Sequence, residues 1–412
     1  MGKINYYKDL LLKNKNLILT GAPGTGKTYM AKLIAEELGA TEENHQCIMV
    51  QFHPSYDYTD FVEGLRPTLP DASGNVGFEL KNGVFKEFCE KARRNQEDSL
   101  KDINTLSVEL QIEDKYNQLV DAIQNGDINK VELKTPGKYA IIAGLSNKNI
   151  IQFKQPRNGQ ISPNKVSLSR LQQLGNEFRT QAQLEGMVNL VKCIRDVIKG
   201  CNATWYWAIL HHLYKTYGDV TDNATINKVE RKNYVFVIDE INRGEISKIF
   251  GELFFSIDPG YRGEKGAVYT QYANMHETDE KFYVPENVYI IGTMNDIDRS
   301  VESFDFAMRR RFVWQEITAE ESAESMSLPQ ECRDRMKAIN NIISEIEGLG
   351  PSYHIGGAYF LDEKGVPIKD FERIWNLRLE PLLREYLRGM PDAEDNLNKL
   401  KKAYGVATDN RQ

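Results

Sequence analysis

The octapeptide GAPGTGKT, Gly21 to Thr28, decides the fold of this chain. It fits the pattern GxxxxGK(S/T), follows the apolar run NLILT and opens the helically periodic stretch TYMAKLIAEELG. In that strand–loop–helix context the glycines turn successive backbone N–H groups toward one anion, and the helix N-terminus adds partial positive charge. A glycine turn that merely starts a helix is the alternative, but it leaves the complete pattern unexplained.

The residue types of this loop predict a site for a nucleoside triphosphate and its magnesium ion. Lys27 is expected to reach the β- and γ-phosphates, and the Thr28 hydroxyl is expected to bind Mg²⁺. The predicted nucleotide-binding residues are Gly21, Ala22, Pro23, Gly24, Thr25, Gly26, Lys27, Thr28 and Tyr29.

The rest of the chain alternates strands and helices on both sides of a long insertion. Apolar, β-branched runs predict strands at 16–20, 46–53, 233–240, 287–295 and 311–317. A polar stretch rich in Pro, Asp, Ser and Gly predicts a loop over 67–82. This alternation predicts an α/β fold, with a parallel sheet covered by helices. The predicted domains are 1–95 (core, first part), 96–230 (an inserted α+β module), 231–318 (core, second part) and 319–412 (a C-terminal helical lid).

Composition excludes several classes of protein. The 412 residues carry a net charge of −7, so a uniformly basic nucleic-acid coat is excluded and any such contact needs a local patch. The five cysteines form no CxxC pair, which favours reduced thiols in a cytoplasmic protein. The N-terminal segment is too polar for a signal peptide, and no apolar run is long enough for a membrane span.

Two adjacent carboxylates end the strand predicted at 233–240. The run YVFVIDE places Asp239 and Glu240 at the carboxyl end of that strand, where open parallel sheets bind ligands. Asp239 is expected to hold Mg²⁺ through water, and Glu240 to polarise the attacking water. Such a pair can also cap a following helix, here EISKIFGELF, but the phosphate loop favours the hydrolytic role.

Three strings together resemble the AAA+ NTPases of the McrB type: GAPGTGKT, VFVIDEINRGEISKIFGELF and NVYIIGTMNDIDRSVESFDFAMRRRF. That family supplies the motor subunit of modification-dependent restriction systems. Further segments resemble its core (QFHPSYDYTDFVEGLRP, FKEFCEKA) and its lid (SYHIGGAYF, FERIWNLRLEPLLREYL). The resemblance covers 15–95 and 230–390 and implies an AAA+ P-loop fold; the MoxR-like chaperone ATPases are the nearest neighbouring group.

The resemblance also implies roles for residues after the strand at 287–295. Asn295 corresponds to the sensor-1 residue, and Asp298 and Arg299 to residues that shape the subunit interface. One or more of Arg309, Arg310 and Arg311 correspond to arginine fingers that reach the nucleotide of a neighbouring subunit. A finger acting in trans implies a ring, which in this family is a hexamer.

The chain departs from the family pattern at three places. Asn295-Asp296-Ile297-Asp298 replaces the usual Asn-Thr-Ala-Asp, which adds a carboxylate beside the sensor. Gly356-Gly357-Ala358 replaces the Gly-His-Ser of the lid, so no lid contact is assigned there. The phosphate loop begins at residue 21, so the separate N-terminal reader domain is expected to be lacking.

The resemblance further implies a nucleotide and partners. GTP is the nucleotide of the McrB family, but this sequence has no base-reading motif that selects it over ATP. A McrC-type nuclease subunit and DNA are the implied partners, because nothing in the chain matches a PD-(D/E)xK nuclease. The alternatives are a MoxR-like chaperone that remodels proteins and a nucleotide-gated interaction switch. Glu240 and Asn295 argue against the switch, since both serve turnover.

The inserted module is locally basic. Residues 130–179 hold nine Lys or Arg and two Glu, a local charge of +7 in an acidic chain. This charge predicts contact with nucleic-acid phosphates through Lys148, Lys154 and Arg157. A solvated basic face or a docking surface for an acidic partner is the alternative. His211 and His212 lie in an apolar helical stripe typical of core packing, without a third metal ligand at the right spacing.

Overall fold

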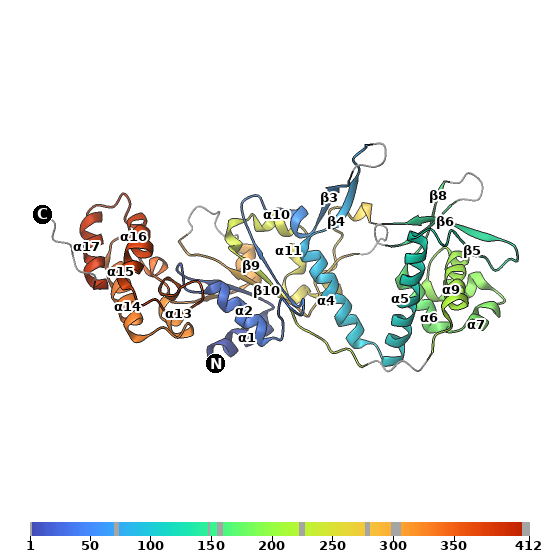
Figure 1. Ribbon diagram of the computed structural model, residues 1–412, viewed down its shortest axis with the longest axis horizontal. Helices are drawn as coiled ribbons and strands as arrows, with labels where there is room; N and C mark the ends of the chain where they lie inside the picture. Colours follow the sequence, from blue (N-terminus) through green and yellow to red (C-terminus); the bar gives the residue numbers. More distant parts are fainter. Residues whose placement is uncertain are drawn as a thin grey trace. The chain divides into compact units, whose positions relative to one another are not determined.

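The computed structural model describes residues 2–69, 74–146, 149–154, 160–221, 227–276, 281–297 and 306–405. The chain forms two compact units: the first unit, Met1–Gln96 with Arg231–Gln412, and the insert, Glu97–Glu230. Figure 1 labels the helices and strands of both units. Among the helices that the structure describes, none is long and apolar enough to cross a membrane.

A five-stranded parallel sheet forms the centre of the first unit, in the order β11-β1-β10-β9-β2. Its strands are β1 (Asn16–Thr20), β2 (Cys47–Gln51), β9 (Tyr234–Asp239), β10 (Val288–Thr293) and β11 (Val313–Glu316). Each lies within one of the five predicted strand segments. The fold class is confirmed: a parallel sheet flanked by helices with a helical lid. Since parallel strands share one carboxyl edge, the ends of β1, β10 and β9 come together there.

Helices cover both faces of this sheet, and alternate strand residues belong to different cores. In β1, Ile18 packs in one hydrophobic cluster, while Leu17 and Leu19 pack in the other. The second cluster is covered by α1 (Gly2–Asn14) and α2 (Lys27–Glu37). The first is covered by α4 (Val84–Leu100), α10 (Ile246–Phe250) and α11 (Leu253–Ser256). Burial on both faces explains why β1, β9 and β10 are almost continuously apolar, and each fully buried aliphatic side chain contributes about 1.5–3 kcal/mol.

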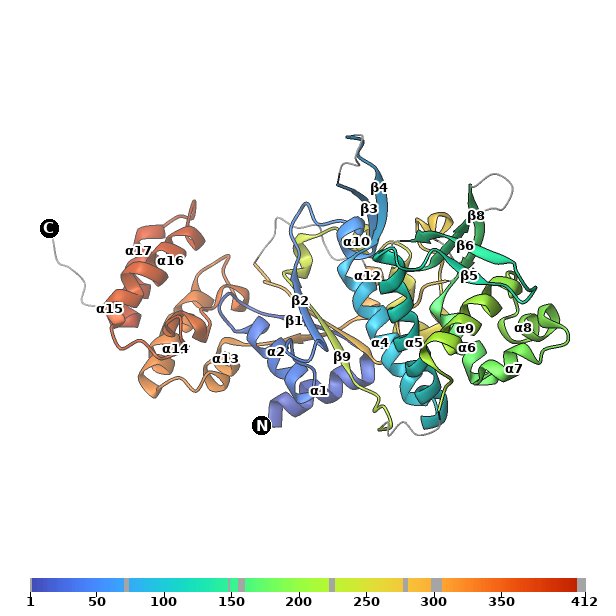
Figure 2. The same cartoon turned by 45° about the vertical axis from the view of Figure 1, so that its right-hand side comes forward.

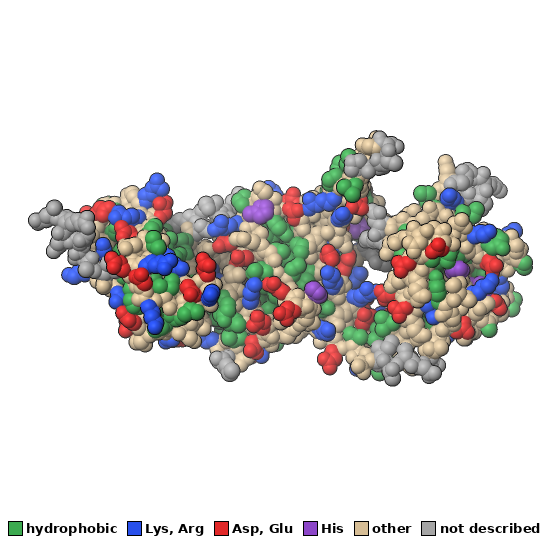
Figure 3. Space-filling view, in the orientation of Figure 1, with side chains coloured by type: hydrophobic (Ala, Val, Ile, Leu, Met, Phe, Trp, Pro, Cys, Tyr) green, Lys and Arg blue, Asp and Glu red, His purple; other side chains and the backbone are tan. Residues whose placement is uncertain are grey.

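A hairpin follows β2 where the sequence predicted only a loop. It consists of β3 (Glu63–Pro67) and β4 (Phe78–Asn82), with Leu65 opposite Leu80, so the loop prediction was wrong for 78–82. Backbone pairing between β3 and β4 holds the hairpin together. Its apolar side chains contribute little, because Leu65 and Phe78 are exposed. Figure 3 shows apolar side chains gathered on this hairpin. At its base the buried Glu63 carboxylate binds the Lys86 amine and His276 Nε2 (2.8 Å).

The C-terminal part of the first unit is a helical lid. Its helices are α13 (Ala319–Ser325), α14 (Gln330–Glu345), α15 (Phe371–Ile374), the π-helical η7 (Trp375–Leu379), α16 (Glu380–Tyr386) and α17 (Ala393–Tyr404). Trp375, Leu379 and Tyr404 are fully buried at its centre. Shorter elements of the first unit are α3 (Tyr58–Phe61), η1 (Ile241–Arg243), η2 (Pro259–Tyr261), η3 (Gly263–Gly266), η4 (Ala273–Met275), α12 (Phe306–Arg311), η5 (Pro351–Tyr353) and η6 (Gly357–Phe360).

The insert packs an antiparallel sheet, in the order β5-β6-β7-β8, on a group of helices. In Figure 2 this sheet lies along one side of the insert, and α6, α7 and α9 lie along the other. Its elements are α5 (Ile103–Gln124), β5 (Lys130–Glu132), β6 (Tyr139–Leu145), β7 (Ile151–Lys154), β8 (Ile161–Val166), α6 (Leu168–Glu177), α7 (Gln181–Glu185), α8 (Leu190–Ile198) and α9 (Ala203–Tyr217). Residues 165–166 end β8, and the segment that follows, up to residue 198, contains the three helices α6, α7 and α8.

Candidate functional site

The phosphate loop runs from the end of β1 into α2, and its glycines are required by space as well as by conformation. Gly24 has φ 73°, and a Cβ there would lie 2.6 Å from the Tyr359 ring. Gly21 has φ 144°, and its Cβ would lie 2.4 Å from the carbonyl oxygen of Ile317. Any side chain would therefore strain the backbone and clash, so only glycine lets the loop close around an anion.

Lys27 lies buried at the centre of this loop. Its amine donates to the carbonyl oxygens of Gly21 (3.0 Å) and Ala22 (2.9 Å) and to Asn295 Oδ1 (2.7 Å). Burial lowers the pKa of Lys27, and nearby carboxylates, the first of them Asp296, oppose that shift. The amine also lies 3.5 Å from the Thr25 hydroxyl, and all four partners are neutral, so an anionic phosphate can take their place with a gain in electrostatic energy.

Thr28 and Asp239 meet at the edge of the sheet as a pair of oxygen ligands. The Thr28 hydroxyl donates to Asp239 Oδ1 (2.7 Å), and the Thr293 hydroxyl of β10 donates to the same oxygen (2.5 Å). Hydroxyl and carboxylate oxygens are ligands that Mg²⁺ accepts, with phosphate and water completing its coordination. The pair therefore fits a nucleotide-bound Mg²⁺, although the described residues contain no group of three or more His, Cys, Asp or Glu that could hold a metal by itself.

Glu240 follows Asp239 in a left-handed backbone conformation, φ 52°. Its carboxylate makes no cap hydrogen bond to the following turn. Instead, Oε1 accepts from Asn295 Nδ2 (2.6 Å), and Arg243 Nε lies 3.3 Å from Oε2. The left-handed conformation is uncommon for a glutamate and turns this carboxylate toward the sheet edge rather than toward the helix.

Asn295 connects the phosphate loop with the carboxylate of Glu240. Its Oδ1 accepts from Lys27, and its Nδ2 donates to Glu240. Because an ammonium only donates and a carboxylate only accepts, the amide orientation is fixed by its two neighbours. The strand order explains the meeting, since β10 lies between β1, which carries the phosphate loop, and β9, which carries the carboxylates.

Asp296, the extra carboxylate beside Asn295, lies close to the same loop. Burial raises the pKa of Asp296, and the Lys27 amine opposes that shift. The Asp296 N–H donates to the Gly21 carbonyl (3.4 Å). This residue therefore adds negative charge at the base of the phosphate loop, next to the lysine.

Models of two protein families match this chain. The AAA domain of the dynein-related subfamily matches residues 16–109 and 204–312, and the alpha-helical lid domain of McrB matches 331–394. The chain is 26% identical over 396 residues to the type IV methyl-directed restriction enzyme EcoKMcrB subunit of Escherichia coli K12, covering 92% of this chain and 55% of that relative.

The chain is an McrB-like AAA+ protein. A second relative is the type II restriction enzyme BsuMI component YdiS of Bacillus subtilis 168, 28% identical over 147 residues, which cover 32% of this chain and 43% of that relative. The chain thus spans about half the length of the curated relatives it matches. Residues 110–203, most of the insert, lie between the two matched parts of the AAA domain.

The three arginines of this McrB-like chain differ in their surroundings. Arg311, at the end of α12, is only 9% exposed, and its guanidinium lies 4.1 Å from the centre of the Phe254 ring. Arg309 and Arg310 are exposed, and Arg309 lies over the Trp314 ring (5.2 Å). Arg311 is therefore directed into its own subunit, while the other two face solvent.

A buried polar network that the sequence did not indicate holds the end of α12. Asn16 Nδ2 donates to the carbonyl oxygens of Arg311 (2.8 Å) and Ile257 (2.7 Å). Asn16 Oδ1 accepts from Arg262 Nη2 (2.5 Å), and Arg262 also donates to Ile257 and Val288 carbonyls. Burial lowers the pKa of Arg262 to about 10. A polar residue, Asn16, at the start of an apolar strand was the one hint of this network in the sequence. Its partner Arg262 lies 246 residues away, so the sequence pattern could not identify it.

Replacing Arg262 by methionine is expected to lower the free energy of unfolding by about 1–3 kcal/mol, because buried acceptors lose their donor. The midpoint of urea unfolding measures this change. Arg231→Met is the matched control, since Arg231 is exposed and only 3.6 Å from Glu286. Its effect should stay within about 0.5 kcal/mol. Equal midpoints for the two variants would contradict the structural role of Arg262.

The lid contacts the phosphate loop at Gly356-Gly357-Ala358, where the sequence led to no assigned contact. The N–H of Gly356 donates to the Pro23 carbonyl (3.1 Å), and the N–H of Ala358 to the Gly24 carbonyl (2.9 Å). Both bonds use the backbone, so the side chains lost from the family pattern are not needed for the contact. A Cβ on Gly356 would lie 2.2 Å from the Gly24 carbonyl carbon, which is the reason for glycine there.

A hollow of about 240 Å³ lies beside the loop, between the lid and the end of the sheet. It is lined by Ala22, Glu316, Ile317, Thr318, Ala319, Glu320, Met336, Lys337, Asn340, Asn341, Pro351 and His354. Burial lowers the pKa of His354, whose Nε2 lies 2.8 Å from Ser344 Oγ, while Glu316 and Glu320 oppose the shift. The hollow therefore offers both hydrogen-bond donors and acceptors next to the phosphate loop.

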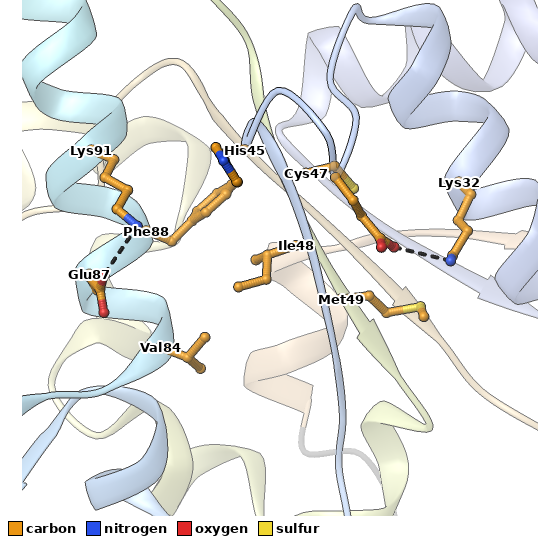
Figure 4. Close-up of a pocket in the computed structure, with 10 residues that line it drawn as sticks. Lys32, His45, Cys47, Ile48, Met49, Val84, Glu87, Phe88 and Lys91 are labelled. Atoms are coloured by element: carbon orange, nitrogen blue, oxygen red, sulfur yellow. Dashed lines mark ion pairs between the residues drawn. The ribbon is translucent and has the colours of Figure 1, made fainter.

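Another hollow, of about 410 Å³, lies beside the edge strand β2 (Figure 4). Ile48, Val84 and Phe88 give it an apolar wall. Ion pairs flank it: Lys32 with Glu42 (3.1 Å) and Lys91 with Glu87 (3.0 Å). It shares no residue with the phosphate site.

Several predicted site residues lie outside the described residues: Asp298 and Arg299 of the interface, and Lys148 and Arg157 of the basic insert. Lys154 is described and exposed at the end of β7. Tyr29, in the first turn of α2, is 51% exposed.

Proposed function

We propose that this chain is a Mg²⁺-dependent nucleoside triphosphatase that drives DNA translocation or remodelling in a modification-dependent restriction system. The observation that carries the proposal is the chain of hydrogen bonds from Lys27 through Asn295 to Glu240. It couples the group that binds phosphate to the group that can accept a proton from water.

Each residue of the site has a separate task in hydrolysis. Lys27 and the loop N–H groups bind the β- and γ-phosphates, and Thr28 and Asp239 hold the metal. The Mg²⁺ ion supplies positive charge that neutralises the transferred phosphoryl group. Glu240 orients a water molecule and accepts its proton, while Asn295 holds the Glu240 carboxylate in place. The left-handed backbone at the half-buried Glu240 keeps that carboxylate at the sheet edge.

The exposed arginines are proposed to act on a second subunit. Arg309 and Arg310 face solvent, so we assign them, rather than Arg311, as the fingers that reach the nucleotide of a neighbour. The assembly is then a ring, a hexamer by resemblance to the McrB type, with Asp298 and Arg299 at its interface. A monomer should hydrolyse slowly, because its own site lacks this charge.

The hollow beside Ala22 is our candidate for the nucleotide base, since it adjoins the phosphate loop and carries polar groups of both kinds. The resemblance to the McrB type favours GTP over ATP. A McrC-type nuclease subunit would supply the cutting activity, and DNA would be the track. The cytoplasm is the proposed location, which agrees with five free cysteines.

Turnover of GTP and of ATP tests the proposal, with the full chain alone, with DNA, with the nuclease subunit and with both. Faster GTP than ATP turnover, stimulated by the nuclease subunit and DNA, is the expected result. Equal and unstimulated rates in every condition would contradict the restriction motor. Stimulation by an unfolded protein client but not by DNA would instead favour a chaperone of the MoxR type.

A further inference from the structure

The insert carries its charges unevenly. From Glu97 to Glu230 the sequence has sixteen basic and fifteen acidic residues, which almost cancel. Within the part that forms the sheet, 130–165, it has seven basic residues and one acidic residue, Glu132. Glu132 is itself neutralised by the Lys215 amine at 2.7 Å. The positive charge is therefore concentrated in this stretch of the sequence, and Lys130, Lys154 and Lys165 lie in its strands, while most of the acidic side chains come from other parts of the insert.

One face of this sheet is the core of the insert and the other faces solvent. Val131, Ala140, Ile151, Phe153 and Val166 are at most 1% exposed and pack on the helices. The strand register sets the residues between them on the opposite face. There Lys130 lies opposite Ile141, Lys165 opposite Gln152, and Lys154 opposite Ile161.

We define the outer sheet face by six residues of that solvent side: Lys130, Tyr139, Ile141, Lys154, Ile161 and Lys165. Its apolar members are unusually exposed: Tyr139 47%, Ile141 48% and Ile161 61%. The Lys130 amine lies 4.8 Å from the centre of the Tyr139 ring. This face thus combines an accessible aromatic ring, two aliphatic side chains and three lysines.

We propose that the outer sheet face binds single-stranded nucleic acid. Lysines alone would suit any polyanion, but an exposed ring beside aliphatic side chains suits unstacked bases, which a duplex does not present. Tyr139 would stack on a base, and Lys130, Lys154 and Lys165 would contact phosphates. This inference rests on the proposed DNA motor. It adds which surface contacts the nucleic acid and that the nucleic acid is single-stranded there.

The position of this sheet in the chain supports a separate role. It lies within 110–203, which the AAA domain match leaves out, so the NTPase core does not require it. Lys154, predicted from charge alone, belongs to the outer sheet face; Tyr139 and the isoleucines were not predicted. The pairing of β5 with β6 and of β7 with β8 places Tyr139 and the two isoleucines beside the lysines. This arrangement distinguishes a base-binding surface from a basic face that is only solvated.

The test measures binding of a fluorescein-labelled oligothymidine of about 20 nucleotides by anisotropy, over a range of salt concentrations. The full chain carries either Tyr139→Ala or the three changes Lys130→Gln, Lys154→Gln and Lys165→Gln. The matched control makes Lys192→Gln, Arg195→Gln and Lys199→Gln, which remove three exposed charges at α8 of the same insert. Basal nucleotide turnover without DNA is recorded for every variant.

Tyr139→Ala is expected to weaken strand binding about tenfold, and the triple lysine variant to reduce the slope of log K against log salt by about 2. The α8 control should match the unchanged protein, and basal turnover should be unaffected throughout. Duplex bound as tightly as the single strand, an equal loss in the α8 control, or equally strong competition by polyglutamate would overturn the proposal. A protein that turns over nucleotide but binds no strand overturns this inference alone, whereas absent turnover under every condition overturns the proposed NTPase.

Discussion

Glu240→Gln is expected to lower nucleotide turnover by about 10²–10⁴-fold while nucleotide binding is retained. Glutamine keeps the size of the side chain, and its carbonyl oxygen can still accept from Asn295 Nδ2, now at 2.6 Å from Glu240 Oε1. It cannot accept a proton from water. Steady-state turnover measures the loss, and titration with a fluorescent nucleotide measures binding.

Glu245→Gln is the control for that experiment. Glu245 lies five positions after Glu240. It is exposed and forms a surface ion pair with Lys248. Its replacement should leave turnover within about twofold, because an exposed ion pair contributes little. If Glu240→Gln lost binding in proportion to turnover, Glu240 would be a binding residue and its assigned role would be wrong.

Removing the exposed arginines is expected to have the largest effect. Arg309→Ala with Arg310→Ala should lower turnover of the assembled protein by about 10³–10⁵-fold, the contribution of an arginine finger. Arg311→Ala should act differently, since Arg311 is buried over Phe254. We expect it to lower the free energy of unfolding by about 1–3 kcal/mol. Turnover and urea unfolding of the variants, including each single arginine variant, separate the two roles.

A mixing experiment shows whether the arginines act in trans. Subunits with Glu240→Gln have intact fingers, and subunits with both arginines replaced have an intact Glu240. When the two inactive proteins are mixed, some sites combine a working Glu240 with a neighbour's fingers, so turnover should partly return. Fingers acting within one subunit would give no recovery, and that outcome would remove the main argument for a ring.

Local patterns in the sequence were sufficient to predict the strands of the sheet, and they also led to the predicted residues of the phosphate site. The apolar runs at 16–20 and 233–240 predict strands because burial on both faces demands continuous apolar residues. The spacing from Gly21 to Thr28 predicts the loop because the chemistry of phosphate binding operates within eight neighbouring residues. Asp239 and Glu240 follow from their place at a strand end.

The hairpin strand at 78–82 and the lid contact were missed for related reasons. Both depend on backbone hydrogen bonds: the hairpin pairs Glu63–Pro67 with Phe78–Asn82, and in the lid the Gly356 N–H donates to the Pro23 carbonyl. Backbone groups are common to all residues except proline, so side-chain patterns carry little information about their partners.

The spacing of the phosphate loop, the two carboxylates at a strand end and the positions of the strand segments are contained in short stretches of the chain. Their chemistry depends on neighbours in sequence, so no folded structure is needed to find them. The different surroundings of Arg311 and Arg310, the hold of Asn16 and Arg262 on α12, and the bridge from Lys27 to Glu240 through Asn295 arise only after folding. These contacts join residues up to several hundred positions apart, and packing in three dimensions alone determines which of them meet.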